Sequence, residues 1–240
     1  MKSAAEREGM HQIVKFTVGL LACACVPVLA RAQVGDGCTY HPGVARWPIK
    51  TSVPAGSQPA NAVAIPLQRF ISLPNLIIPH DQIGYFQDKR IPAHPSFPYQ
   101  EGQIVSTIGF LQWAKCEVDD NDYHLQLSLT PAGQGGCLIV EVPDARFADP
   151  ALNASVQAVR QFVRQNFFAG AVPHGRPHVS ARVEVVGQLF FDAPHLTQVA
   201  REGPGGGRGS GQCPAKTLWE IHPILAMHLV SPSHPLPGPH

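Results

Sequence analysis

The order of apolar and polar residues predicts five β-strands in the second half of the chain. Alternation is clearest from Tyr123 to Leu129, where every second residue is apolar, and this period is typical of a strand with one buried face. The short run CLIVEV is almost wholly apolar, as expected of a largely buried strand. The predicted strands are residues 104–118, 123–129, 137–142, 179–191 and 217–230.

One helix is predicted between the third and fourth strands. In residues 152–168 apolar side chains recur at helical spacing, namely at Val156, Val159, Phe162, Val163 and Phe167.

Three residues interrupt the predicted strands. Gly109 and Gly187 each indicate a bulge or a bend. Pro223 indicates either an edge position or a bulge in the last strand.

The order β-β-β-α-β-β is that of a five-stranded Greek-key barrel, the OB type that binds oligonucleotides and oligosaccharides. An open α+β sheet with the same order of elements is the alternative. If the barrel is formed, the third and fifth strands are parallel neighbours.

Residues 33–101 form a different kind of segment. Ten prolines recur through it, and proline favours extended and turn conformations. We expect an arm that lies on the barrel, with one short strand near residues 64–73. The predicted organisation is therefore a signal peptide (1–32), a Pro-rich arm (33–101), the barrel domain (102–230) and a disordered tail (231–240).

The first 32 residues predict export. Lys15 precedes the uncharged run FTVGLLACACVPVLA, and Ala30-Arg31-Ala32 is the small-x-small pattern of a cleavage site. Either Met1 or Met10 can be the start. The apolar run is short for a membrane span, so we expect cleavage before Gln33 and a periplasmic or extracellular protein. A lipoprotein anchored at Cys23 is the alternative.

The mature chain is close to neutral. Removing residues 1–32 removes four of the 18 basic and two of the 17 acidic side chains, which leaves 14 and 15. Such a chain has no overall field that attracts nucleic acid or anionic lipid. Binding of a polymer or protein partner must come from a local site.

Four cysteines remain after cleavage, and in an exported chain an even number favours disulfides. Three pairings of two disulfides are possible. In the barrel, Cys137 and Cys213 lie near the same end of neighbouring parallel strands. We therefore predict a Cys137–Cys213 disulfide, which leaves Cys38 to pair with Cys116.

Four polar stretches carry a resemblance. They contain the motifs DxDYH, EVPD, GxxFFDxxH and WEIHP, at residues 120–124, 141–144, 187–195 and 219–223. In this order they resemble a family of uncharacterised exported bacterial proteins over residues 102–230. The resemblance implies one domain that brings these stretches together, and it implies no established activity. The Gly-rich insert before Cys213 is long for this family, and the arm before Gly102 has no clear counterpart in it.

Carboxylates and imidazoles within these stretches suggest a metal site. Side chains two apart on a strand leave the same face, as do Glu220 with His222 and Asp122 with His124. In the barrel these residues share a rim with Glu141. They could hold Ca²⁺, Mn²⁺ or Zn²⁺, although their spacing matches no known ligand motif. The alternatives are a solvated DDND turn and hydrogen-bonded pairs that only stabilise the barrel.

Further residues are candidates for ligand binding. Asp119 and Asp120 lie in the DDND turn, and Asp192 with His195 suggests an acid–base pair. The barrel topology predicts that this pair lies at the end opposite the turn. Arg208 lies in the loop REGPGGGRGSGQC, which could cover a phosphate or a sugar or could be a flexible linker.

The sequence favours an exported binding module for an oligosaccharide, a protein or a nucleic acid. A metal-dependent, nuclease-like hydrolase that uses the Asp/His/Glu cluster is the first alternative. A structural or accessory protein is the second.

Overall fold

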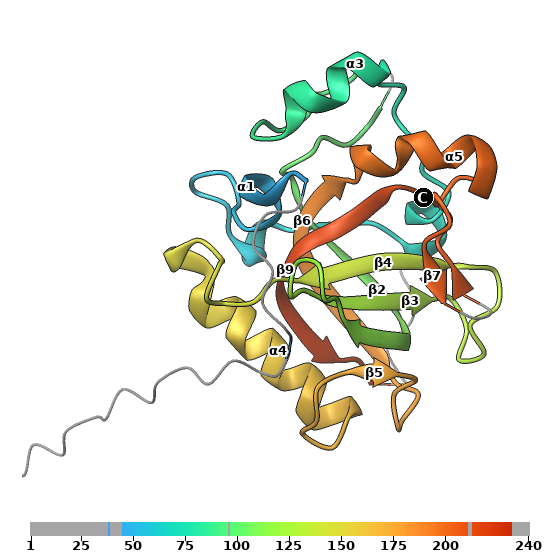
Figure 1. The fold of residues 1–240 in the computed structure, drawn as a ribbon. Helices are drawn as coiled ribbons and strands as arrows, with labels where there is room; N and C mark the ends of the chain where they lie inside the picture. The colour runs from blue at the N-terminus through green and yellow to red at the C-terminus, as the bar shows by residue number, and fades with distance from the viewer. Residues whose placement is uncertain (1–37, 39–44, 96, 211–212, 232–240) are drawn as a thin grey trace, which may run out of the picture. The chain divides into compact units, whose positions relative to one another are not determined.

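The computed structural model describes residues 38, 45–95, 97–210 and 213–231 (Figure 1). They belong to one compact unit, Gly35–His240. The predicted signal peptide, the alternative anchor Cys23 and residues 232–240 of the predicted tail lie outside the described residues.

Five strands close into a barrel, which confirms the predicted OB-like fold. Each strand hydrogen-bonds to two others in the cycle β2–β3–β4–β9–β6–β2. All pairs are antiparallel except β4 with β9. The strands are β2 (Ile104–Cys116), β3 (Tyr123–Ser128), β4 (Cys137–Val142), β6 (Arg182–Phe191) and β9 (Trp219–Leu229).

Four further strands have two residues each, and two of them pair with the barrel. The strands β1 (Val63–Ala64) and β5 (His174–Gly175) pair with β2, in parallel and antiparallel orientation respectively. The strands β7 (Gly209–Ser210) and β8 (Cys213–Pro214) form a small antiparallel hairpin in the connection between β6 and β9. The Gly-rich segment therefore contains regular structure.

The parallel pairing of β9 with β4 decides which of their residues lie side by side. These strands are paired through Val140 and Ile221, so His222 lies beside Glu141 near the end of β4. Trp219, at the beginning of β9, lies near the beginning of β4 and is paired with Phe191 at the end of β6. The end of β6 therefore lies level with the beginning of β4.

The predicted helix is α4 (Asn153–Phe167), and it packs against β4 and β9 (Figure 1). Its apolar face is buried at Val156, Val159, Val163 and Phe167, as the helical spacing predicts.

The arm is more helical than its prolines suggest. The short strand expected near residues 64–73 is reduced to the two residues Val63–Ala64, and Leu67–Phe70 is a helix. Proline is tolerated at the start of a helix because the first N–H groups need no partner there. Pro48 lies in the first turn of one arm helix, and Pro66 and Pro79 each precede another.

The arm helices and the turns of the barrel connections are short. In the arm they are α1 (Trp47–Lys50), η1 (Pro59–Asn61), α2 (Leu67–Phe70), α3 (His80–Ile83) and η2 (Gly84–Phe86). In the connections they are η3 (Pro150–Leu152), η4 (Ala193–His195) and α5 (Leu196–Glu202).

A buried ion pair attaches the arm to the barrel. The Arg46 guanidinium donates to both carboxylate oxygens of Glu101, at 2.6 and 2.8 Å, and to the carbonyl of Phe191 at 2.7 Å. Glu101 also accepts from the backbone N–H of Phe191 at 2.9 Å. Neither charged side chain is exposed. No spacing in the sequence of the arm links Arg46 to Glu101, so the contact was not predicted.

The interruptions of the strands are partly as predicted. The register between β6 and β9 shifts on both sides of Gly187, and Pro223 lies in the shifted part after a cis bond. The bulge alternative for Pro223 is thus confirmed. In β2 the register shifts between Leu111 and Trp113 and not at Gly109. A Cβ atom on Gly109 would lie 2.7 Å from Leu67 Cδ2, so this glycine permits close packing of the arm.

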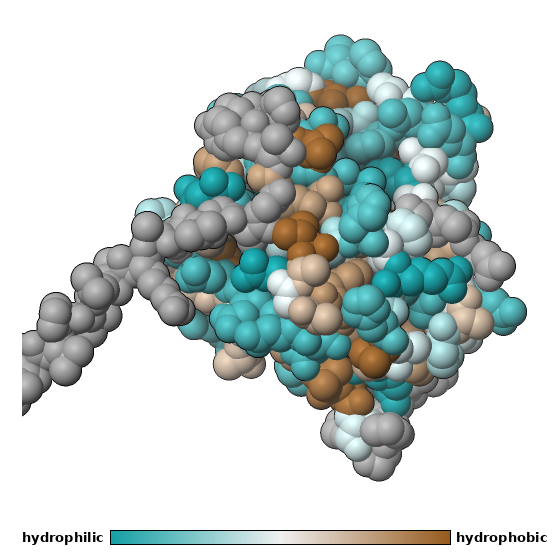
Figure 2. All heavy atoms as spheres, turned by 60° about the horizontal axis from the view of Figure 1, so that its bottom comes forward, coloured by the Kyte–Doolittle hydropathy of each residue, from teal (hydrophilic) through white to brown (hydrophobic). Residues whose placement is uncertain are grey.

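Both predicted disulfides are present, Cys38–Cys116 and Cys137–Cys213, with Cα atoms 5.9 and 5.1 Å apart. Among the described residues no helix has the length and apolar character needed to cross a bilayer. On the face shown in Figure 2, apolar residues lie in separate patches between polar ones.

Candidate functional site

A polar pocket of about 360 Å³ opens at the rim where β4 ends. It lies between the turn after β2 and the connection from β6 to β9. Its walls contain acidic and basic side chains and no aromatic ring other than two imidazoles. It is lined by Ala45, Lys50, Lys115, Glu117, Asp119, Asp120, His124, Glu141, Asp192, Pro194, His195, Gly207, Arg208 and Gly209.

The pocket corrects one prediction about Asp192 and His195. They were expected at the end of the barrel opposite the DDND turn, but they line the same pocket as Asp119 and Asp120. The connection that follows β6 reaches this pocket because Arg208, which also lines it, is paired with both Asp192 and Glu220. All five residues predicted to bind a ligand, Arg208 included, line this pocket.

The Gly-rich connection is held in place by Arg208. Its guanidinium donates to Asp192 Oδ2 at 2.8 Å and is paired with Glu220, which is 1% exposed. It also donates to the carbonyl of Thr217. The described part of this connection is therefore tied to the barrel by buried charges, and the flexible-linker alternative is wrong for it.

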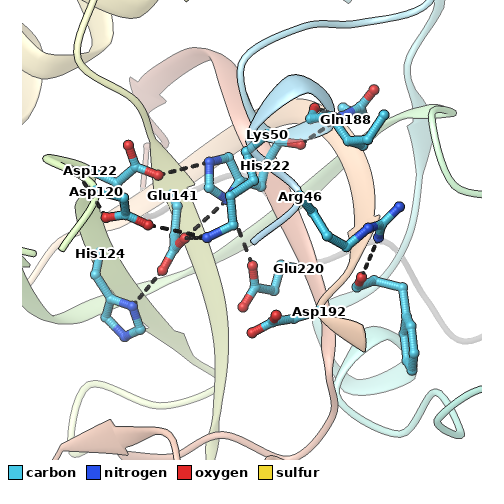
Figure 3. Close-up of polar contacts among 12 residues, drawn as sticks. Arg46, Lys50, Asp120, Asp122, His124, Glu141, Gln188, Asp192, Glu220 and His222 are labelled. Carbon is cyan, nitrogen blue, oxygen red and sulfur yellow. Dashed lines mark hydrogen bonds and ion pairs between the residues drawn. The ribbon is translucent and has the colours of Figure 1, made fainter. Parts of the chain in front are cut away.

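His222 lies in a buried cluster of carboxylates (Figure 3). Its Nε2 is 3.0 Å from Asp122 Oδ2 and its Nδ1 is 3.0 Å from Glu141 Oε2. Burial alone would lower the pKa of His222, but Asp122 and Glu141 outweigh burial and raise it to about 9. Burial, together with the nearby charge of Asp120, raises the pKa of Asp122 to about 6.

Glu141 connects this cluster to the pocket. Its Oε1 is hydrogen-bonded to His124 Nδ1 at 2.6 Å, while its Oε2 faces His222. Burial would raise the pKa of Glu141, but His124, His222 and Lys50 hold it well below the ordinary value.

Lys50 is a member of the site that sequence reasoning missed. It comes from the arm helix α1, and its Nζ lies 3.1 Å from Asp120 Oδ2 and 4.0 Å from Glu141 Oε2 (Figure 3). Burial would lower the pKa of this ammonium, but Glu141, Asp120 and other carboxylates raise it above its ordinary value. The segment WPIK lies far from the polar stretches in sequence, and no spacing connects it to them.

A second histidine–carboxylate pair lies across the pocket. His195 Nδ1 is 2.6 Å from Asp192 Oδ2, and the side chain of Asp192 is 8% exposed. Burial would raise the pKa of Asp192, whereas Arg208 and His195 lower it below its ordinary value.

The five residues predicted to hold a metal all lie in this network, with unequal roles. Asp122, Glu141 and His222 offer ligand atoms that all lie within 4.8 Å of one another. The other two have different contacts: His124 is hydrogen-bonded to Glu141, and Glu220 is paired with Arg208.

Two large aromatic residues near the site, Trp219 and Tyr123, lie in the core. Trp219 is 1% exposed and stacks on Phe97 with ring centroids 4.7 Å apart. Tyr123 is fully buried below the guanidinium of Arg160, which lies 3.7 Å from the ring centroid. Neither ring lines the rim pocket.

Acid should weaken the stabilisation that Asp192 provides. Because the pKa of this carboxyl is lowered on folding, its contribution is complete above its ordinary pKa of 3.8 and is lost as pH falls below that value. We expect Asp192→Asn to be less stable than the wild type by about 2 kcal/mol at pH 6, with the difference shrinking below pH 4, by analogy with charged hydrogen bonds. Urea unfolding between pH 6 and about pH 2.5 measures this difference.

The exposed residue Asp88 provides the control for this experiment. Asp88→Asn should match the wild type throughout the pH range. A difference for Asp192→Asn that stays constant down to the lowest pH would contradict the assigned ion pairing.

Comparison with protein-family models and with curated proteins finds no match to this chain.

Proposed function

We propose that this protein is an exported binding module that holds a hydroxyl-rich ligand, an oligosaccharide, in the rim pocket. The observation that carries the proposal is the position of the pocket. It lies between the first strand connection of the barrel and the connection from β6 to β9. OB-type barrels use the corresponding two loops to bind oligonucleotides and oligosaccharides.

The lining of the pocket favours a sugar over a nucleic acid. Its charges are already paired inside the protein: Lys115 Nζ lies 2.7 Å from Glu117 Oε1, Lys50 is paired with Asp120, and Arg208 with Asp192. Proteins that bind single-stranded nucleic acid present unpaired positive charge and aromatic rings for stacking. Paired carboxylates, imidazoles and ammonium groups instead offer hydrogen bonds to hydroxyl groups without a strong net field.

Export is supported by the oxidised cysteines as well as by the N-terminal sequence. Both disulfides close long loops, with partners 78 and 76 residues apart. Disulfides of this kind persist in oxidising compartments such as the periplasm and the extracellular space.

The binding proposal predicts selective capture of oligosaccharides. An array of neutral and acidic oligosaccharides, with short single-stranded DNA and RNA as further probes, should give binding to a neutral sugar, which calorimetry in chelator then quantifies. Asp119→Asn and Lys115→Gln should each weaken this binding at least about tenfold, or ~1.4 kcal/mol. Both side chains line the pocket, and neither lies in the buried network.

Asp81→Asn is the matched control, because Asp81 is an exposed carboxylate on α3 that does not line this pocket. Binding of nucleic acid in place of sugar would overturn the choice of ligand. Sugar binding that is equally strong in all three variants would move the site elsewhere on the surface.

A metal-dependent hydrolase is the second candidate. It is favoured by the two histidine–carboxylate pairs, His124–Glu141 and His195–Asp192, which line one pocket. A carboxylate that holds the Nδ1 side of an imidazole orients its Nε2 for general acid–base catalysis. Incubation of the captured sugar, DNA and RNA with the protein and Mn²⁺ tests for cleavage that His195→Gln abolishes.

A further inference from the structure

We propose that Asp122, Glu141 and His222 form a binding site for one borderline divalent cation, Mn²⁺ or Zn²⁺, at the buried floor of the rim pocket. The proposal is independent of the sugar ligand, because Asp122 and His222 lie behind the pocket lining and only Glu141 of the three ligands is part of it. Its first support is distance: one donor atom from each of the three side chains lies within 4.8 Å of the other two. Donor atoms that share one metal ion at bond lengths of about 2.0–2.2 Å are separated by this order of distance.

The second support is a buried carboxylate oxygen without a partner. Asp122 is fully buried, and its Oδ1 has no hydrogen-bond partner among the described residues. Its Oδ2 has only the short contact with His222 Nε2. Removing a carboxylate oxygen from water without replacing its hydrogen bonds is unfavourable, and a bound cation would replace them.

The third support is the geometry of the imidazole. The Nε2 of His222 lies 3.0 Å from Asp122 Oδ2 and its Nδ1 lies 3.0 Å from Glu141 Oε2. The ring therefore lies between the two carboxylates (Figure 3). Either ring nitrogen could bind an ion together with the carboxylate oxygen beside it.

The charges of the surrounding network also favour a cation. Five buried carboxylates lie in it, whereas its positive charges are fewer, namely those of Lys50, of Arg208 and, before an ion binds, of the His222 imidazolium. A divalent ion would reduce this excess of negative charge in a region of low dielectric. The carboxylates are Asp120, Asp122, Glu141, Asp192 and Glu220.

The burial of the three ligands determines how the ion would reach its site. Asp122 and His222 are not exposed, whereas Glu141 lines the pocket. The ion would therefore enter from the pocket and keep its open coordination position on that side. One imidazole with two carboxylates suits Mn²⁺ or Zn²⁺, because Ca²⁺ takes about six to eight oxygen ligands.

Lys50 provides a distinctive test of this site. Its ammonium lies 4.0 Å from Glu141 Oε2, so it repels any cation that binds there. Lys50→Met should therefore tighten cation binding several-fold. If the three residues form only an ion-pair cluster, the same substitution should leave the protein without any bound ion.

The experiment uses the full exported chain after treatment with chelator, and the probes are Mn²⁺, Zn²⁺ and Ca²⁺ alone. Plasma mass spectrometry and calorimetry should give one equivalent of Mn²⁺ or Zn²⁺, with a raised melting temperature. Asp122→Asn and His222→Gln should weaken binding at least about tenfold, or ~1.4 kcal/mol. Glu184→Gln is the control, because Glu184 forms a surface pair with His228 at 2.9 Å, outside this network.

Two results would overturn the proposal: no stoichiometric ion on the wild type at millimolar metal, or equal affinity in the wild type and in folded Asp122→Asn. Circular dichroism establishes whether each variant is folded. If the ligand variants do not fold, two measurements still test the site. The wild type should bind one ion, and Lys50→Met should bind it more tightly than the wild type does. Sugar binding is measured separately in chelator, so its failure is distinct from failure of the cation site.

Discussion

Glu101→Gln is expected to lower the free energy of unfolding by about 3–5 kcal/mol, as breaking a buried ion pair by removing one partner does. The Arg46 guanidinium is fully buried and bonded to both oxygens of Glu101. Glutamine has nearly the same shape but no charge, so the variant leaves a buried cation uncompensated. Urea unfolding followed by tryptophan fluorescence measures the change.

Glu101→Gln should also disturb the position of Lys50 in the rim pocket. Arg46 directly precedes the helix that carries Lys50, and Lys50 is the arm's ammonium group in the site.

The control is Glu184→Gln, which removes a carboxylate from an exposed pair with His228 and should lower the free energy of unfolding by about 0.5 kcal/mol or less. Equal losses in the two variants would contradict a special role for the Arg46–Glu101 pair.

Arg208→Met is expected to lower the free energy of unfolding by a similar amount, about 3–5 kcal/mol, and to disrupt the pocket. Arg208 is paired with both Asp192 and Glu220, and Glu220 is 1% exposed. Without the guanidinium, two buried carboxylates lose their nearest permanent positive charge. Methionine keeps the apolar stem, so the loss reports mainly on charge.

Arg201→Met is the matched control for this prediction. Arg201 lies in the same connection, on α5, and is exposed, so its replacement should change stability by about 0.5 kcal/mol or less. Chemical denaturation and sugar binding of both variants are compared. If Arg208→Met lowers the free energy of unfolding as little as Arg201→Met does, the buried carboxylates do not depend on Arg208.

Most of the barrel could be predicted because the sequence patterns of its strands and helix are local. The run from Tyr123 to Leu129 alternates with a period of two, and the run from Val156 to Phe167 has a helical period. Each period is a property of neighbouring residues. The expected single buried face holds for the helix, whereas β3 is buried on both faces, since His124, Gln126 and Ser128 are also covered. The disulfide pairing also followed, because the order of elements makes the third and fifth strands parallel neighbours.

The arm was predicted less well because its conformation depends on contacts far along the chain. Pro66 favoured an extended segment, yet Leu67–Phe70 is a helix whose Leu67 and Phe70 are buried against the barrel. Tertiary packing there outweighs the local preference. The pairing of Arg46 with Glu101 spans 55 residues and has no periodic signature.

The sequence by itself determined the strand order, the helix, the disulfide pairing and the polar residues Asp122, Glu141 and His222 as candidates for one site. Only the tertiary structure decided that Asp192 and His195 share the pocket with the DDND turn, and that Lys50 enters it from the arm. The reason is geometric. A period in the sequence sets which face a side chain occupies, whereas the position of the β6–β9 connection and the docking of the arm are set by contacts between distant segments.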